Sequence, residues 1–204
     1  MDLALLVLRL VVGLFFVGHG AQKLFGAFGG HGIQGTAQFF ESIGIRPGKR
    51  NAQAAGWSEL IGGALLVLGL FTPLAALLII SVMTTAILSV HAKNGPWVTD
   101  SGFEYNLVLV ATAFVVAANP GDWSLDAALG LGEIHGTAFA LAALVLGALG
   151  GALALAAGRN AKLAGAPPTP TAQAQEARFE RTPSEKRAAT IDEQDRPDIP
   201  ADPR

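Results

Sequence analysis

The chain alternates long apolar stretches with short polar connections, and this pattern is typical of a membrane protein built from helices. The apolar stretches cover about residues 3–26, 54–71, 74–90, 104–118 and 136–157. A helix rises about 1.5 Å per residue, so about 20 apolar residues cross the hydrocarbon core of a bilayer. We therefore expect an all-α, polytopic bundle, in which the short stretch 104–118 spans only if Glu104 and Tyr105 lie in the interface.

The connections between the apolar stretches indicate how the chain is organised into units. Residues 27–54 form a long connection in which Phe39, Phe40 and Ile43 fall at helical spacing, which predicts a short helix along the membrane interface. The sequence Thr72-Pro73 joins two stretches so tightly that they must be antiparallel neighbours. We expect a four-helix unit over 1–130, an additional transmembrane helix within 131–158 and a disordered tail over 159–204, where Pro, Ala, Gln and charged residues dominate.

The basic residues predict an orientation. One side of the membrane would hold every Lys and Arg of the connections and the start of the tail, namely Lys23, Arg46, Lys49, Arg50, Lys93, Arg159 and Lys162. The connections on the opposite side hold none. By the positive-inside rule, the N-terminus is then outside and the C-terminus is cytoplasmic.

Composition excludes several functions. The chain has 14 Lys and Arg against 16 Asp and Glu, so it lacks the basic excess that nucleic-acid binding requires. It has no cysteine, so it can form no disulfide and can offer no thiolate to an iron–sulfur cluster. The Met-Asp start has no basic segment before the first apolar stretch, which favours a retained helix over a cleaved signal peptide.

Ionisable residues inside the apolar stretches need partners, because charge is costly in hydrocarbon. If the helices alternate in direction, one end of the bundle collects most of these polar residues: His19, Gln22, Lys23, Glu59, His91 and Glu104. Arg9 lies about 15 Å from His19 along the helix. We expect Arg9 to extend its side chain to the opposite interface.

Each of these residues also has a structural interpretation. Lys23 and Glu104 are close enough to helix ends to reach the headgroups, and His19 and His91 could be ordinary hydrogen-bonded residues. Glu59 lies deeper, where a carboxylate is costly unless it is paired or protonated, which favours a functional or bundle-fixing role. The acids and histidines follow no metal-ligand spacing, so we predict no metal site and no haem. His31 and His135 receive no role.

The order and spacing of several segments resemble the DoxX family of small bacterial membrane proteins, also called DoxX/DoxD-like. These segments are LRLVVGLFFVGHGAQKLFG, GTAQFFESIGI, WSELIGGALLVLGLFTPLAA, HAKNGPW and GFEYNLVLVATAF, within about residues 3–130. The resemblance implies a four-helix unit in the bacterial inner membrane. It also implies that the family's polar positions correspond to Arg9, Gly18, His19, Lys23, Glu59, Gly62, Gly63 and Glu104.

The resemblance further implies a redox setting. The family is named for a subunit associated with thiosulfate:quinone oxidoreductase, and some members are described in a complex with superoxide dismutase and a sulfurtransferase. The first hypothesis is thus the membrane component of a quinone-linked oxidoreductase complex in sulfur or oxidative-stress metabolism. Its electrons would come from partner subunits, because the chain itself suggests no cofactor.

In that hypothesis the catalytic residues are Glu59, His19 and Lys23, with Glu59 exchanging protons. The quinone would be bound by Arg9, Gln22, His91 and Glu104. The alternative is a non-enzymatic scaffold that recruits soluble redox enzymes to the membrane. A small-solute transporter is a third hypothesis, suggested by the glycines and the intramembrane charges. The sequence makes no prediction of the oligomeric state.

Overall fold

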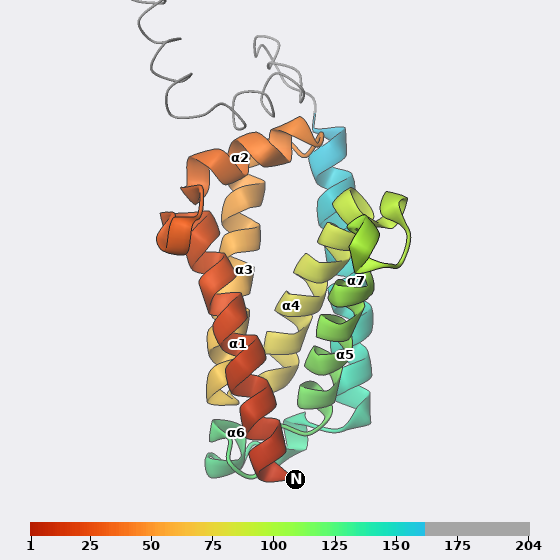
Figure 1. The fold of residues 1–204 in the computed structure, drawn as a ribbon. Helices are drawn as coiled ribbons and strands as arrows, with labels where there is room; N and C mark the ends of the chain where they lie inside the picture. Colours follow the sequence, from red (N-terminus) through yellow and green to blue (C-terminus); the bar gives the residue numbers. More distant parts are fainter. Residues whose placement is uncertain (162–204) are drawn as a thin grey trace, which may run out of the picture. The chain divides into compact units, whose positions relative to one another are not determined.

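The computed structural model describes residues 1–161, and every regular element in that range is a helix. The α-helices are α1 (Asp2–Phe25), α2 (Gly32–Ser42), α3 (Gly48–Leu68), α4 (Thr72–Ala86), α5 (Glu104–Ala118), α6 (Leu125–Ala128) and α7 (Thr137–Asn160). Figure 1 shows α1, α3, α4, α5 and α7 running along one bundle, with α2 across one end and α6 at the other end beside the N-terminus. The predicted disordered tail lies outside the described residues from position 162 onward.

Each apolar stretch of the sequence lies on a helix. Three helices are long and apolar enough to cross a membrane: α1, the segment Thr72–Asn94 that begins with α4, and α7. The helix α5 is apolar but shorter, and it begins at Glu104 as predicted. The helix α3 begins at Gly48, ahead of the predicted start near 54, so its first turn carries the basic residues Lys49 and Arg50. That these five helices all cross the bilayer stays a prediction.

Glycines let α1 and α3 pack closely. A Cβ added to Gly63 would lie 2.6 Å from the carbonyl oxygen of Gly13, and one added to Gly20 would lie 2.6 Å from the amide nitrogen of Leu60. Only residues without a side chain allow backbones to approach in this way. The two helices are therefore held side by side along most of their length.

The helix α4 is the centre of the bundle and contacts α3, α5 and α7. Its Ile79 and Ile80 are fully buried. Small residues of α7 pack on it, since a Cβ on Gly147 would meet Leu77 and Ile80 and one on Gly151 would meet Ser81. Beyond Ala86 the helix continues as a π-helical turn, Ile87–His91, instead of the regular helix predicted to residue 90. Such turns widen a helix and are frequent at functional sites.

The short connections follow local chemistry. The helix α3 is capped at its end by Gly69, whose φ of 63° suits a residue without a side chain, and Pro73 lies in the first turn of α4, where no amide donor is needed. After α5, the side chain of Asn119 accepts a hydrogen bond from the Gly121 amide at 2.9 Å and turns the chain. The segment that follows, including α6, folds back toward the start of α1 (Figure 1).

Candidate functional site

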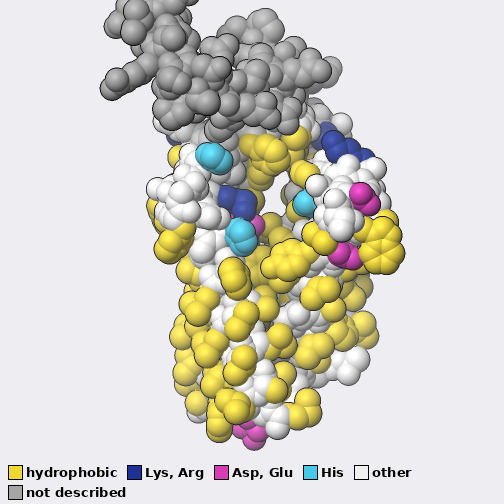
Figure 2. All heavy atoms as spheres, in the orientation of Figure 1, with side chains coloured by type: hydrophobic (Ala, Val, Ile, Leu, Met, Phe, Trp, Pro, Cys, Tyr) yellow, Lys and Arg dark blue, Asp and Glu magenta, His cyan; other side chains and the backbone are white. Residues whose placement is uncertain are grey.

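A cavity of about 370 Å³ lies among α1, α2, α3, α4, α5 and α7, at the end of the bundle where α1 finishes. Most of its wall is apolar. Its polar members are His19, Lys23, Asn51, Ser58, Glu59, Ser81, Thr85, Ser89, His91, Tyr105 and Asn106. Figure 2 shows this end hollowed between α1 and the α5 side, with basic, acidic and histidine side chains in its walls. We call this space the inner cavity.

Lys23 and Glu59 meet in the wall of the inner cavity. The Lys23 Nζ atom lies 2.6 Å from Oε2 and 2.9 Å from Oε1 of Glu59, so the ammonium group bridges both carboxylate oxygens. The Glu59 side chain is only 4% exposed, whereas that of Lys23 is 27% exposed. The ion pair joins α1 to α3 at the level where Gly20 and Gly56 bring the two helices close. Two of the three residues predicted to be catalytic are thus in direct contact.

His19 lies one helical turn before Lys23 and also lines the inner cavity. Its Nδ1 atom is 3.1 Å from Oε1 of Gln22. An amide oxygen only accepts hydrogen bonds, so this contact places a proton on Nδ1. The Gln22 amide in turn donates to the carbonyl oxygen of Phe28 at 3.4 Å. Gln22 therefore supports His19 from outside the inner cavity.

His91 and Glu104 have different surroundings, although the sequence places both at this end. His91 lines the inner cavity, and its Nδ1 atom lies 2.8 Å from the carbonyl oxygen of Ser101. Glu104 does not line the cavity. Its Oε1 atom accepts a hydrogen bond from the Val98 amide at 2.9 Å, which holds the loop before α5. Among the predicted quinone-binding residues, His91 is in the inner cavity and Glu104 serves the loop.

Arg9 is at the opposite end, and the expectation that it extends to the interface is wrong. Its side chain is fully buried, and Nη2 donates a hydrogen bond to the carbonyl oxygen of Trp123. Within residues 1–161, its Nε and Nη1 atoms have no hydrogen-bond partner. The connection between α5 and α7 thus holds the side chain at that end, and Arg9 does not line the inner cavity.

Beside Arg9 lies a group that the sequence analysis missed. The Asp126 carboxylate accepts hydrogen bonds from the Phe71 amide at 2.7 Å and from the amide and hydroxyl of Thr72, both at 3.0 Å. His135 lies 2.9 Å from the same carboxylate and, since a carboxylate only accepts, donates from Nε2. We call Arg9, Thr72, Asp126 and His135 the sealed cluster.

The electrostatics of Asp126 follow from these contacts. Burial raises the pKa of its carboxyl group, but the hydrogen bonds from Thr72, His135 and Phe71 together outweigh burial and hold the pKa below its ordinary value. Its carboxylate also lies at the start of α4, where a helix favours negative charge. No sequence spacing signals this site, because its members come from two connections and one span.

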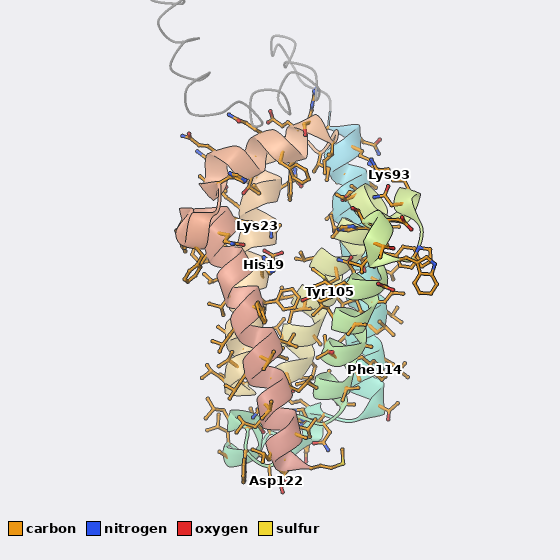
Figure 3. The ribbon with its side chains drawn as sticks, viewed as in Figure 1. His19, Lys23, Lys93, Tyr105, Phe114 and Asp122 are labelled. Atoms are coloured by element: carbon orange, nitrogen blue, oxygen red, sulfur yellow. The ribbon has the colours of Figure 1, made fainter. Side chains whose placement is uncertain are left out.

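The inner cavity also contains residues that the sequence analysis did not select. Tyr105 was predicted only as an interface residue, yet it lines the inner cavity from α5. Figure 3 shows it across from His19 and Lys23 of α1. Asn106 is buried and donates to the Met83 sulfur at 3.4 Å. Within residues 1–161, no cluster of three or more His, Asp or Glu side chains is arranged to hold a metal ion.

Comparison with known proteins gives a consistent set of relatives. Residues 4–92 match the family model described as DoxX. The chain is 34% identical over 110 residues to "Putative oxidoreductase CatD" of Bacillus subtilis, a match covering 54% of this chain and 75% of that protein. It is 30% identical to an uncharacterised membrane protein of Mycobacterium tuberculosis, over 60% of this chain and 79% of the relative. No solved structure matches the chain significantly.

Proposed function

The chain belongs to the DoxX family of membrane proteins, and we propose that it is the membrane component of an oxidoreductase complex that binds a quinone in the inner cavity. The observation that carries this proposal is the Lys23–Glu59 ion pair in the wall of a mostly apolar cavity. A charged pair at such a place can hold a proton beside an apolar ligand, which an apolar wall alone cannot do.

The residues present fit a quinone. Its ring is flat and apolar with carbonyl oxygens that accept hydrogen bonds, and its tail is hydrocarbon. The inner cavity, at about 370 Å³, is within the usual size of small-molecule sites, and Phe16, Phe39 and Phe40 supply aromatic wall. The donors that a carbonyl oxygen needs are the Lys23 ammonium group and the Tyr105 hydroxyl.

Lys23 is suited to bind a carbonyl oxygen while it stays paired. An ammonium group has three donors, and the two carboxylate oxygens of Glu59 engage two of them. The third donor stays available toward the inner cavity. Lys23 would therefore orient the ring, and Glu59 would keep the ammonium group in place.

Glu59 and His19 are suited to move protons. A bound quinone supplies two-electron chemistry that consumes protons at its carbonyl oxygens. The Glu59 carboxylate can hold a proton on either oxygen, and His19 lines the same cavity while its ring is exposed on the outer side. His19, near the end of α1, would collect protons at the membrane interface and deliver them toward Glu59. His91 would exchange protons from the opposite wall of the inner cavity.

Partner subunits would supply the electrons. The chain has no cysteine, so thiolate-bound clusters and dithiol exchange must lie in another protein. The family resemblance suggests superoxide dismutase and a sulfurtransferase as partners, and the relative CatD carries an oxidoreductase name. In the orientation predicted from the basic residues, the inner cavity would lie in the cytoplasmic leaflet of the inner membrane, within reach of soluble enzymes.

The test is to purify the protein from its own membranes in mild detergent and to measure the quinone that is extracted with it. We expect stoichiometric quinone with the wild-type chain and with the control Glu133→Gln, which makes the same chemical change at an exposed loop position. We expect Glu59→Gln and Lys23→Met to retain about tenfold to a hundredfold less, because a hydrogen bond involving a charged group is worth about 1.5–3 kcal/mol.

A different result would favour the scaffold. The Lys23–Glu59 pair would then only fix α1 to α3, and each charge already has its partner without any ligand. In that case the lipid extracted with the wild-type chain would contain phospholipid and no quinone, and the redox enzymes would copurify with both the wild-type chain and Glu59→Gln. Equal quinone in the wild-type chain and Glu59→Gln would also contradict the proposed proton-holding site.

A further inference from the structure

We propose that the ligand of the inner cavity enters sideways from the bilayer, through an opening between α1 and α5 that is flanked by His19 and Tyr105. This inference rests on the proposed function and specifies its ligand as an amphipathic lipid. The polar ring would lie beside Lys23 and Glu59. The hydrocarbon tail would extend outward along α1.

Two pockets meet at this opening. A second pocket, which we call the outer pocket, lies on the outer side of α1 and is lined by Leu14, Phe15, Gly18, His19, Gln22, Phe28 and Tyr105. His19 and Tyr105 line both the outer pocket and the inner cavity. These two side chains therefore form the boundary between the interior of the bundle and its surface.

The packing of the bundle leaves this boundary weak. The helix α1 packs along α3, and α5 packs along α4, whereas α1 and α5 contact each other only briefly. Figure 3 shows His19 and Tyr105 on these two facing helices. A side chain rotation at either residue would widen the opening without moving a helix, and rotations of exposed side chains take picoseconds to nanoseconds.

The chemistry of the outer pocket indicates what passes through it. Leu14 is 58% exposed, Phe15 is 63% exposed, and both lie on a helix long and apolar enough to cross a membrane. In a bilayer such side chains contact lipid tails and not water. A hydrophilic solute has no favourable path along this surface, whereas a hydrocarbon tail does. The geometry thus favours a ring with a long tail over a small soluble quinone analogue.

Gly18 offers a way to close the opening without disturbing the fold. A Cβ added at Gly18 would meet no atom within 4 Å, although Gly18 lines the outer pocket. A leucine there would occupy the outer pocket, and leucine is a better helix former than glycine. Gly20, only two residues away, lacks this freedom because its Cβ would collide with Leu60.

The first experiment compares two probes in liposomes: a long-tailed ubiquinone and a ubiquinone with a single isoprenoid unit. We expect Gly18→Leu to slow uptake of the long-tailed probe at least tenfold and to leave equilibrium binding of the short-tailed probe unchanged. The control Gly132→Leu, at an exposed loop glycine whose added Cβ would also meet nothing, should behave as the wild-type chain does. If Gly18→Leu took up the long-tailed probe as fast as the wild-type chain does, the inference would be overturned.

Glu59→Gln separates this inference from the proposed function. It should weaken binding of both probes, because it alters the site of the ring and not the opening. If both probes bind the wild-type chain and Gly18→Leu has no effect, the proposed opening between α1 and α5 is wrong and the quinone site stands. If neither probe binds the wild-type chain, both ideas are wrong.

A second measurement tests the opening between α1 and α5 without any quinone. The chain has no cysteine, so Tyr105→Cys carries a single fluorescent label. In vesicles containing phospholipids with brominated acyl chains, we expect strong quenching of a label at this position. Quenching by a water-soluble agent in place of the brominated lipid would place the opening in water and overturn lateral entrance.

Discussion

Helix α1 contributes one basic residue to each end of the bundle, and the two residues differ in how deeply they are buried. At one end Arg9 is fully buried beneath the connection between α5 and α7, next to Asp126. At the other end Lys23 is 27% exposed and faces the inner cavity beside Glu59. The same helix thus ends in a closed polar cluster on one side and in an open one on the other.

The difference lies in how fully each carboxylate is engaged by the protein. Asp126 accepts hydrogen bonds from two backbone amides, a hydroxyl and an imidazole, which tie the start of α4 to the segment around α6. Glu59 receives its hydrogen bonds from Lys23, whose third donor stays available. A buried carboxylate whose hydrogen bonds all come from the fold stabilises that fold, whereas one whose partner keeps a free donor can take part in binding a ligand. The comparison predicts large stability effects at the sealed cluster and small ones at the inner cavity.

The largest effect should come from Asp126→Ala. The change leaves the Phe71 and Thr72 amides without their acceptor and removes a negative charge that acts on Arg9. Losing a buried, hydrogen-bonded charge costs about 3–5 kcal/mol, so we expect a clear fall in Tm. The Tm is measured in detergent by tryptophan fluorescence. The control is Asp122→Ala at a neighbouring exposed aspartate. Equal Tm values for the two variants would show that the sealed cluster does not stabilise the fold.

A smaller effect, with a defined sign, should appear in acid. The folded chain holds the pKa of Asp126 below its ordinary value, so the folded state binds fewer protons there than the unfolded state. The stabilisation is therefore complete above the ordinary value of 3.8 and is lost as the pH falls through the lower, folded pKa. We expect the Tm difference between the wild-type chain and Asp126→Ala to shrink over this window. Arg9 and His135 are the basic groups that face Asp126.

A constant Tm difference down to the most acidic conditions would contradict this account. The Asp122→Ala variant serves again as the control, because it should lose stability in acid in parallel with the wild-type chain. The same scan of Glu133→Gln checks that an arbitrary loop carboxylate does not produce the effect.

The helices were predictable because their signals are local. Apolar stretches placed α1, α4, α5 and α7 to within a few residues, and breakers such as Pro73 placed the turns. The start of α3 was missed because Lys49 and Arg50 interrupt the apolar pattern, although helix formation tolerates both residues well.

The inner cavity was partly predictable from alternation alone. Antiparallel helices bring His19, Lys23, Glu59 and His91 to one end, and all four line the inner cavity. Which side chains point inward was not predictable, since Glu104 turns to a loop amide. That choice depends on loop geometry, which no helical period encodes.

The sealed cluster was not predictable, because it depends on which connection covers which helix end. Arg9 in a span suggests a side chain that reaches water, and only the return of the segment around α6 buries it instead. Asp126 and His135 have ordinary loop surroundings in the sequence. The hydrogen bonds of Asp126 with Thr72 and with His135 are set by tertiary packing alone.

The smallest effect should come from neutralising both members of the ion pair at the inner cavity. Lys23→Met alone leaves the Glu59 carboxylate, 4% exposed, without its partner, and we expect it to cost about 1–3 kcal/mol. The double variant Lys23→Met/Glu59→Gln removes both charges, and a neutral replacement of a buried ion pair is often close to neutral, so it should be within about 1 kcal/mol of the wild-type chain.

A double-mutant cycle of thermal unfolding measures this difference, with quinone retention recorded on the same samples. We expect the double variant to fold almost as stably as the wild-type chain and yet to retain little quinone, because the inner cavity uses the pair for its ligand. A double variant as unstable as Asp126→Ala would instead show that the polar residues at both ends of the bundle are needed to stabilise the fold. The scaffold hypothesis would then be the better account, since the main role of the ion pair would be to stabilise the fold.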